Sequence, residues 1–401
     1  MKLFTRNFTL LILGQASSLL GNGALRFAVS MYVLDATGSA GTFSLIVALS
    51  MLPMIVLSPL GGVLADRRRI MVALDALSGL TVLLGALTLA LGGGVAAVGV
   101  LLIALSVLGA FESPTVQACV PQMLSGENVL RGNAAVSQVQ AVTSLVTPFL
   151  GAAAYSAFGL GSVMLAAAAC FFLTALLECF IRLGCTPRGA KGGVLPTVRT
   201  DLAESARFLR REQPDVLKLL LLSGAASMFL SGVMVVGYPY LVRTTLGLSS
   251  AHYGVAESAA GVAAILGSVA AGFMSVRGAA WMRRMLGMSG VAVLVAGAGF
   301  ALGLGAEFVV LMAAFSLANM ACSAFSVCAM TAIQRRTPES LTGKVMAFVY
   351  TLSLCAQPLG QLLYGALFDA LPPAWVLIPS GAVVAAAAIV LRGFFAQLDL
   401  P

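Results

Sequence analysis

Long runs of apolar residues alternate with short polar or charged segments along the whole chain. Most runs hold roughly 20 residues, which as α-helix suffices to cross a bilayer core about 30 Å thick. The runs lack the alternation of apolar and polar residues, over about ten positions, that is typical of a membrane barrel. The pattern predicts twelve membrane-spanning helices, near residues 8–33, 42–64, 70–91, 95–118, 134–157, 160–183, 217–242, 253–275, 280–303, 308–330, 344–370 and 373–396.

Two short features recur at an offset of 210 residues, which indicates a duplicated six-helix unit. Pro148 of the fifth predicted span recurs as Pro358 of the eleventh, and both are expected to kink their helices. The pair Gly62 and Arg67, at the end of the second span, recurs at the end of the eighth. The predicted domains are an N-terminal six-helix bundle (1–183), a cytoplasmic connector (184–216) and a C-terminal six-helix bundle (217–401).

The connector is the longest polar stretch, and residues 201–211 have the pattern of a short amphipathic helix. It is either an interfacial link between the bundles or a regulatory, partner-binding element.

Composition and charge place the chain in the membrane. Hydrophobic residues make up 60% of it and charged residues 9%, whereas soluble domains are typically about 45–50% apolar and about 25% charged. Every Lys and Arg except Arg26 and Arg243 falls in segments that share one side of the membrane. The positive-inside rule makes that side, with both termini, cytoplasmic. The net charge of +8 therefore sets orientation and contact with anionic lipids, and does not indicate nucleic-acid binding.

Residue types that would support an enzyme or a metal site are scarce. The seven cysteines form no Cys-x-x-Cys pair, and the single histidine lies near an outer loop. No phosphate-binding loop or nucleophile elbow is present. The first apolar run is too long for the apolar core of a signal peptide. We expect no cofactor, no metal and no enzymatic activity.

The segment Gly61-Gly62-Val63-Leu64-Ala65-Asp66-Arg67-Arg68-Arg69 forms a tight polar hairpin between two predicted spans. It resembles the loop between the second and third spans of major facilitator superfamily transporters. Further segments resemble the macrolide-efflux and siderophore-exporter branch of drug:proton antiporters: Asn7–Leu11, Gly14–Gly21, Asp35–Ala40, Phe111–Asn133, Gln334–Pro338 and Gly343–Val345. Two features depart from that branch: the fourth span contains no arginine, and the Gly-Pro motif of the fifth is reduced to Val146–Gly151.

The resemblance implies an all-α membrane protein with the major facilitator fold, two pseudo-symmetric bundles that work as a monomer in the bacterial cytoplasmic (inner) membrane. It implies a secondary transporter that exports amphipathic organic compounds by proton antiport with alternating access. A dedicated siderophore, metabolite or lipid exporter of the same fold is the alternative, and a non-transporting sensor or scaffold is a third possibility.

The resemblance also assigns a conformational latch, made of Gly61, Gly62, Asp66, Arg67 and Lys344. Asp66 would lie against the N-terminus of the eleventh helix, which stabilises a negative charge. The two glycines would let the helices approach closely, and Arg67 would orient the acid. The alternative is a turn whose arginines only set topology.

Charged side chains inside the spans are candidates for proton coupling, because burying them is costly. They are Glu112, Asp75 and Arg26. A carboxyl group in apolar surroundings favours its protonated form, so Glu112 could carry a proton. Alternatively, it could reach cytoplasmic water or cap a local helix break at Pro114. Asp75 could instead pair with the hairpin arginines, and Arg26 could bind substrate or pair with Asp35.

Five uncharged polar residues are candidates for lining a substrate cavity, and hydrogen bonding between helices is the alternative role. They are Gln15, Asn22, Gln138, Gln357 and Gln361. Gln138 and Gln357 lie in the proline-containing spans that resemble gate helices of the family. The 17 Met and 21 Phe would suit an adaptable apolar pocket.

Overall fold

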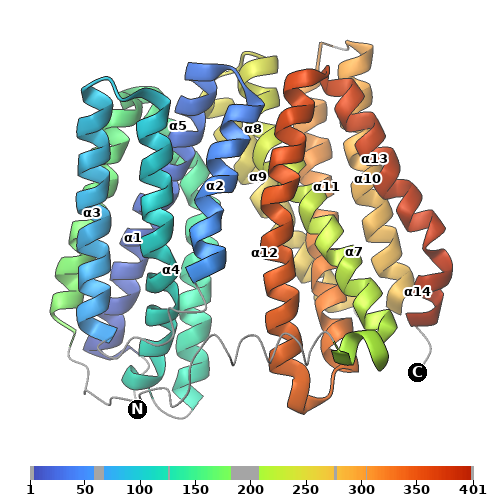
Figure 1. Ribbon diagram of the computed structural model, residues 1–401, viewed down its shortest axis with the longest axis horizontal. Helices are drawn as coiled ribbons and strands as arrows, with labels where there is room; N and C mark the ends of the chain where they lie inside the picture. The colour runs from blue at the N-terminus through green and yellow to red at the C-terminus, as the bar shows by residue number, and fades with distance from the viewer. Residues whose placement is uncertain are drawn as a thin grey trace. The chain divides into compact units, whose positions relative to one another are not determined.

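The computed structural model describes residues 4–57, 67–124, 127–181, 207–274, 278–303 and 305–398, and there the regular elements are all helices (Figure 1). In this part of the chain, eleven helices are long and apolar enough to cross a membrane. One of them, α5 (Glu127–Cys179), contains two spans, because Gly159 interrupts its helical backbone with φ 73° and ψ 177°. The predicted all-helical membrane fold is confirmed.

The chain divides into two compact units, which we call the first and second units. The first unit holds α5, the start of α9 up to Gly254, the second half of α2, and three further helices. These helices and α2 have the bounds α1 Arg6–Thr37, α2 Ala40–Leu57, α3 Arg67–Ala90 and α4 Gly94–Met123. Within the unit, α5 packs along α1 and α3, and α3 also packs along α4.

The second unit holds the first turns of α2, up to Ala48, and the helices that follow the predicted connector. Their bounds are α7 Pro214–Leu230, η2 Ser231–Gly237, α8 Tyr238–Tyr240, η3 Leu241–Thr245, α9 Ser250–Met274, α10 Gly278–Leu302, α11 Glu307–Arg336, α12 Glu339–Ala370, α13 Pro373–Val390 and α14 Arg392–Leu398. Helix α10 packs along α11 and α13, whereas α12 packs along α7 and η2.

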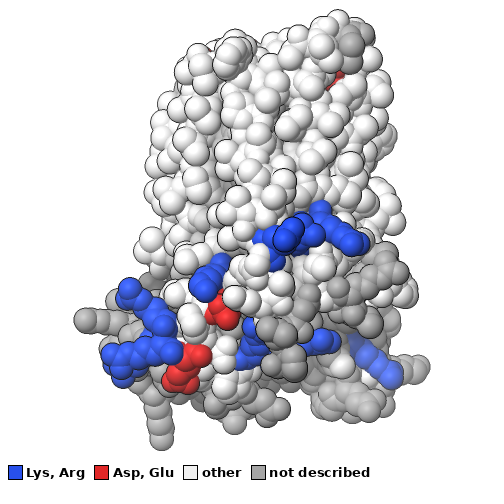
Figure 2. Space-filling view, turned by 90° about the vertical axis from the view of Figure 1, so that its right-hand side faces the viewer, with Lys and Arg blue, Asp and Glu red and all other residues white. Residues whose placement is uncertain are grey.

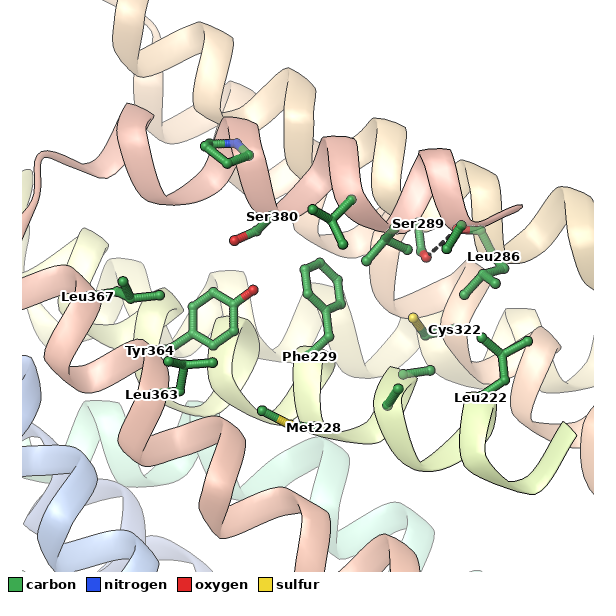
Figure 3. A pocket seen from close by; sticks show the side chains of 16 residues that line it. Leu222, Met228, Phe229, Leu286, Ser289, Cys322, Leu363, Tyr364, Leu367 and Ser380 are labelled. Atoms are coloured by element: carbon green, nitrogen blue, oxygen red, sulfur yellow. Dashed lines mark hydrogen bonds between the residues drawn. The ribbon is translucent and has the colours of Figure 1, made fainter. Parts of the chain in front are cut away.

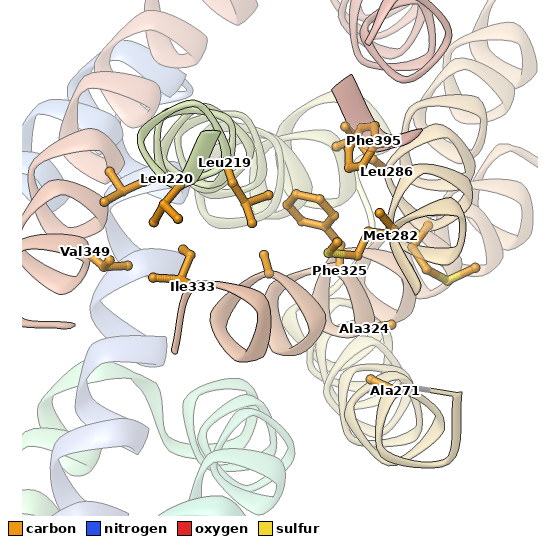
Figure 4. Close-up of a cluster of buried hydrophobic side chains, with 14 of the residues drawn as sticks. Leu219, Leu220, Ala271, Met282, Leu286, Ala324, Phe325, Ile333, Val349 and Phe395 are labelled. Atoms are coloured by element: carbon orange, nitrogen blue, oxygen red, sulfur yellow. The ribbon is translucent and has the colours of Figure 1, made fainter. Parts of the chain in front are cut away.

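Each unit has its own apolar core. In the first unit, Phe8 and Leu11 of α1 meet Met71 of α3 and Val120 of α4. In the second unit, the larger cluster joins α7, α10, α11, α12 and α14, and Figure 4 shows Leu219 and Phe325 at its centre. Residues outside these clusters leave many large apolar side chains uncovered by protein, as expected of helices that face lipid.

The seventh span is not a uniform α-helix. Two stretches, η2 and η3, have π-helical hydrogen bonding, and the three-residue α8 separates them. The apolar pattern alone predicts a single helix over 217–242, since a π turn changes the hydrogen bonding without changing the apolar composition.

Several helices extend beyond the predicted spans. Helix α11 continues to Arg336, although the apolar run ends near residue 330. Arg335 and Arg336 lie in its last turn, where positive charge interacts favourably with the helix dipole. These helices therefore extend beyond the apolar core of the membrane, and their polar ends lie outside it. Of the predicted connector helix, residues 207–211 are helical, and 201–206 lie outside the described residues.

Candidate functional site

Three carboxyl side chains come together inside the first unit, each from a different helix. Asp75 of α3 and Glu178 of α5 are 0% and 1% exposed, and Glu112 of α4 is half-buried. Burying a carboxyl group away from water is costly, so three in one place mark a candidate functional site.

A serine of α1 joins two of these acids. The Ser18 hydroxyl oxygen lies 3.3 Å from Oδ1 of Asp75 and 3.4 Å from Oε1 of Glu112. A hydroxyl has one proton to donate, so Ser18 can donate to only one of the two carboxylates at a time. If the second acid is protonated, it can donate to the Ser18 oxygen instead. We call Ser18, Asp75, Glu112 and Glu178 the acid cluster.

Glu178 faces Asp75 across the cluster. Oδ2 of Asp75 and both carboxyl oxygens of Glu178 are buried without a partner of good hydrogen-bond geometry. Two carboxyl groups can hydrogen-bond to each other only if one of them is protonated. Within the described chain, none of the three acids forms an ion pair with Lys or Arg. The arrangement is therefore suited to holding and sharing protons.

Close packing between α1 and α5 holds the cluster in place. The Thr174 hydroxyl donates to the Gly14 carbonyl at 3.0 Å, and the Ser17 hydroxyl donates to the Cys170 carbonyl at 3.1 Å. These bonds fix the turn of α1 that carries Ser18 against the turn of α5 that carries Glu178. Gln15, predicted as a cavity residue, is 5% exposed and reaches Glu112.

Arg26 and Asn22 lie elsewhere on α1. Nε of Arg26 donates to Oδ1 of Asn22 at 3.3 Å, and Arg26 is exposed. Eight residues of helix, about 12 Å along the axis, separate Arg26 from Ser18. Asp35, the alternative partner considered for Arg26, accepts a hydrogen bond of 2.9 Å from the Tyr155 hydroxyl. The structure thus places Arg26 apart from the acid cluster.

The predicted polar residues of α12 lie on one face of that helix, in the second unit. Nε2 of Gln361 donates to the Ser231 hydroxyl of η2 at 2.9 Å, and Gln361 is buried. Gln357, one turn earlier, is half-buried, and Pro358 is buried. The hydrogen bond between Gln361 and Ser231 joins the eleventh span to the seventh.

The remaining predicted residues lie in different surroundings. Gln138 of α5 is exposed, Pro148 lies in the first half of α5, and Lys344 is half-buried in the second turn of α12. Gly61, Gly62 and Asp66 lie outside the described residues. Arg67 is the first residue of α3, but its side chain is outside the described part of the chain.

The sequence interpretation did not single out Ser18 or Glu178. Glu178 carried a usable signal, because it is an acid about five residues inside the predicted sixth span. Ser18 carried none, since serines are common in apolar helices and make local hydrogen bonds there.

Comparison with known sequences matches most of the chain to one family. A sequence profile described as the Major Facilitator Superfamily matches residues 11–356. Macrolide efflux protein A of Streptococcus pyogenes is 30% identical over 157 residues, which are 38% of this chain and 38% of that protein. The matched segment therefore spans well under half of that curated relative.

Solved structures resemble the full length of the chain. The nucleoside transporter NupG has a TM-score of 0.74 at 12% identity, covering 99% of this chain and 100% of that one. A bacterial homologue of the iron transporter ferroportin, in an inward-facing state, has a TM-score of 0.70 at 19% identity and covers 99% of both chains. At such identities the likeness shows the fold alone.

Proposed function

This chain belongs to the Major Facilitator Superfamily of membrane transporters, and from that premise we propose that it exports amphipathic organic compounds in exchange for protons. It works as a monomer by alternating access, with a small organic molecule and protons as its partners. The acid cluster is the observation that supports proton coupling most directly.

The cluster supports proton exchange because, among the residues that the structure describes, no Lys or Arg forms an ion pair with its acids. Three ionised carboxylates in one buried site would repel one another and lack solvation. The site therefore holds protons while it is dry, and gives them up when a conformational change brings water or another charge to it. Glu112, which is only half-buried, is the member best placed to exchange with water. Asp75 and Glu178 share the proton behind it.

The substrate class rests on the relative, and the orientation rests on charge. Macrolide efflux protein A matches over a limited segment, so drug export remains a proposal for this chain.

Lys and Arg gather toward one end of the face that Figure 2 shows. In the second unit, Lys218, Arg283 and Arg284 lie near helix starts and Arg336 at a helix end. We assign that end to the cytoplasm of a bacterial inner membrane.

The latch remains a separate proposal from the sequence. Asp66→Asn should abolish or severely reduce transport while leaving membrane insertion intact, because it removes the charge that a helix N-terminus would stabilise. Near-normal transport by this variant would rule the latch out.

Proteoliposomes with an imposed pH gradient test the proposed function. The purified protein should accumulate a radiolabelled macrolide only when the gradient is present, and should dissipate the gradient as it does so. Glu112→Gln should lose gradient-driven accumulation but keep exchange of labelled for unlabelled compound, since exchange needs no net proton movement. Asp35→Asn, an acid of the same unit bound to Tyr155, is the matched control and should behave like the parent protein.

Each alternative gives a different result in this assay. A dedicated siderophore, metabolite or lipid exporter would ignore the macrolide, and a sensor or scaffold would move nothing. Proton-driven accumulation that persists in Glu112→Gln and in Asp75→Asn would refute the role of the acid cluster.

A further inference from the structure

The second unit contains a partly open pocket that the proposed proton coupling does not use. Its volume is about 380 Å³, and residues of α7, α10, α11, α12 and α13 line it (Figure 3). This volume lies within the range of roughly 300–1,000 Å³ that small-molecule sites occupy. We call it the lateral pocket.

Helix packing explains why the lateral pocket exists. The span formed by α7 and η2 packs tightly against α12. An added Cβ at Gly232 of η2 would meet the carbonyl oxygen of Gly360 of α12, and an added Cβ at Gly360 would meet the carbonyl oxygen of Met228 of α7. Gly290 of α10 and Gly381 of α13 make the same kind of close crossing. Two tight helix pairs result, whereas α12 and α13 make few contacts with each other. The pocket is the wedge that remains between the pairs, so it is preformed.

The walls of the lateral pocket are apolar and aromatic. Phe229 and Tyr364 form an edge-to-face pair with ring centroids 6.1 Å apart, and Figure 3 shows the Phe229 ring projecting into the space. Few polar side chains line it. The Ser289 hydroxyl donates to the Leu286 carbonyl at 2.7 Å, and the Tyr364 and Ser380 side chains lie close together (Figure 3). An occupant with one polar group could therefore hydrogen-bond to Tyr364 or Ser380.

The lateral pocket opens toward the surface that lipid covers. Leu363 of α12 and Val383 of α13 line it and are 45% and 68% exposed. The exposed side chains farther along α13 are apolar as well, including Trp375 and Ile389. Uncovered apolar side chains on membrane-spanning helices face the bilayer. A molecule dissolved in the bilayer can thus enter between α12 and α13.

We propose that the lateral pocket binds a compact aromatic compound, with one hydrogen-bonding group, that reaches it from the bilayer. Aromatic rings fit the geometry of Phe229 and Tyr364, because ring pairs prefer offset or edge-to-face contacts. The rotatable hydroxyls of Tyr364 and Ser380 can reorient to meet one polar group. A flexible lipid chain would gain neither contact, and would lose more conformational freedom on binding. That such a compound is also exported rests on the proposed function. Its binding to the lateral pocket can be measured without transport.

A matched pair of substitutions on α13 tests the inference. Ala387 lines the lateral pocket, and its neighbour Ala386 is exposed and does not line it. The probe is N-phenyl-1-naphthylamine, a neutral aromatic amine with one N–H. Its binding to the purified, full-length protein in detergent is followed by energy transfer from the two tryptophans of the chain. Ala387→Phe should raise the half-saturating concentration by about tenfold or more, because its ring would occupy the space. Ala386→Phe should leave it unchanged.

Three further arms make the outcome decisive. If Ala387→Phe lowers the unfolding temperature severely, Phe229→Leu decides instead, since it removes the ring without filling the space. Gradient-driven accumulation by the parent protein is measured separately in proteoliposomes, so failure of the proposed proton coupling and failure of the lateral pocket are distinguished. Native mass spectrometry counts retained phospholipid. Probe binding that survives both Ala387→Phe and Phe229→Leu overturns the proposal, and phospholipid lost only in Ala387→Phe would assign the space to a lipid chain.

Discussion

The backbone N–H of Ala40, at the start of α2, donates a hydrogen bond of 2.7 Å to Oδ1 of Asp369, at the end of α12. The other carboxylate oxygen accepts from the Ser39 hydroxyl at 2.7 Å and from the Gly41 N–H at 3.0 Å. A side chain 329 residues away thus satisfies N–H groups that a helix start leaves without partners. This explains why the first turns of α2 belong to the second unit, and the rest of the helix to the first.

Replacing Asp369 should loosen this attachment. Asp369→Ala removes the acceptor of three hydrogen bonds and a charge at a helix N-terminus, and should lower the free energy of unfolding by about 1–2 kcal/mol. Asp369→Asn keeps one acceptor oxygen and should cost less. Thermal unfolding in detergent measures both.

Asp215 supplies the control for this change. It forms an exposed ion pair of 3.0 Å with Lys218 on α7, and such pairs contribute about 0–1 kcal/mol. Asp215→Ala should therefore have a smaller effect. Equal effects of Asp369→Ala and Asp215→Ala would contradict the attachment of α2 to α12.

Glu178 should matter for coupling as much as Glu112 does. Glu178→Gln keeps the size and hydrogen-bonding ability of the side chain but cannot release a proton. Accumulation driven by a pH gradient should fall by about tenfold or more, the scale on which one proton-transfer group acts. Exchange of labelled for unlabelled compound should continue.

The adjacent residue provides the comparison. Cys179 is exposed, so Cys179→Ala should transport normally in the same proteoliposomes. If Glu178→Gln accumulates compound as well as Cys179→Ala does, Glu178 is a structural residue and not a proton carrier.

Gly360 should not tolerate a methyl group. An added Cβ there would meet the carbonyl oxygen and Cα of Met228, which are backbone atoms and cannot rotate away. Gly360→Ala should therefore destabilise the second unit by about 1–3 kcal/mol, as overpacking of a close helix crossing does.

The same substitution in an open position should act in the opposite direction. Gly109 of α4 has no atom within 4 Å of its Cβ position apart from those of its own helical backbone and adjacent residues. Gly109→Ala should stabilise the protein by about 0.5–1 kcal/mol, because alanine favours the helix. Thermal unfolding of the two variants side by side measures the difference, and a stabilising Gly360→Ala would contradict the close crossing.

Gly159 carries the break between the fifth and sixth spans. Its φ of 73° and ψ of 177° belong to a region that glycine alone adopts readily. Gly159→Ala should cost about 1–3 kcal/mol and reduce the yield of folded protein. Gly161→Ala, two residues away with open space around it, should express normally. Equal yields of the two variants would show that the turn does not need the left-handed backbone.

The fold could be predicted largely from the sequence, because membrane helices are specified by composition and length. Apolar runs of about 20 residues have one stable form in lipid, in which every backbone group is paired internally. Local pattern could not give the break at Gly159 or the π turns of the seventh span. Both depend on backbone hydrogen bonding, which composition does not record.

The acid cluster could be predicted only in part. Asp75 and Glu112 stood out because each is an acid inside an apolar run. That they meet Ser18 and each other depends on how α1, α3 and α4 pack, and this is tertiary information. Gln361 shows the same limit, since its partner Ser231 is 130 residues away. The position of the lateral pocket could not be predicted from the sequence, because most of its lining residues are apolar and resemble those that face lipid or other helices.

The π turns of the seventh span also change how its faces must be numbered. Every π turn takes up one residue more than an α turn, so the side chains beyond it are rotated by about 100° from an uninterrupted helix. A helical wheel drawn through Pro214–Thr245 with a single repeat would misplace positions after Ser231, Tyr238 among them. Spin labels or cysteines for accessibility mapping should be chosen with separate wheels before and after η2.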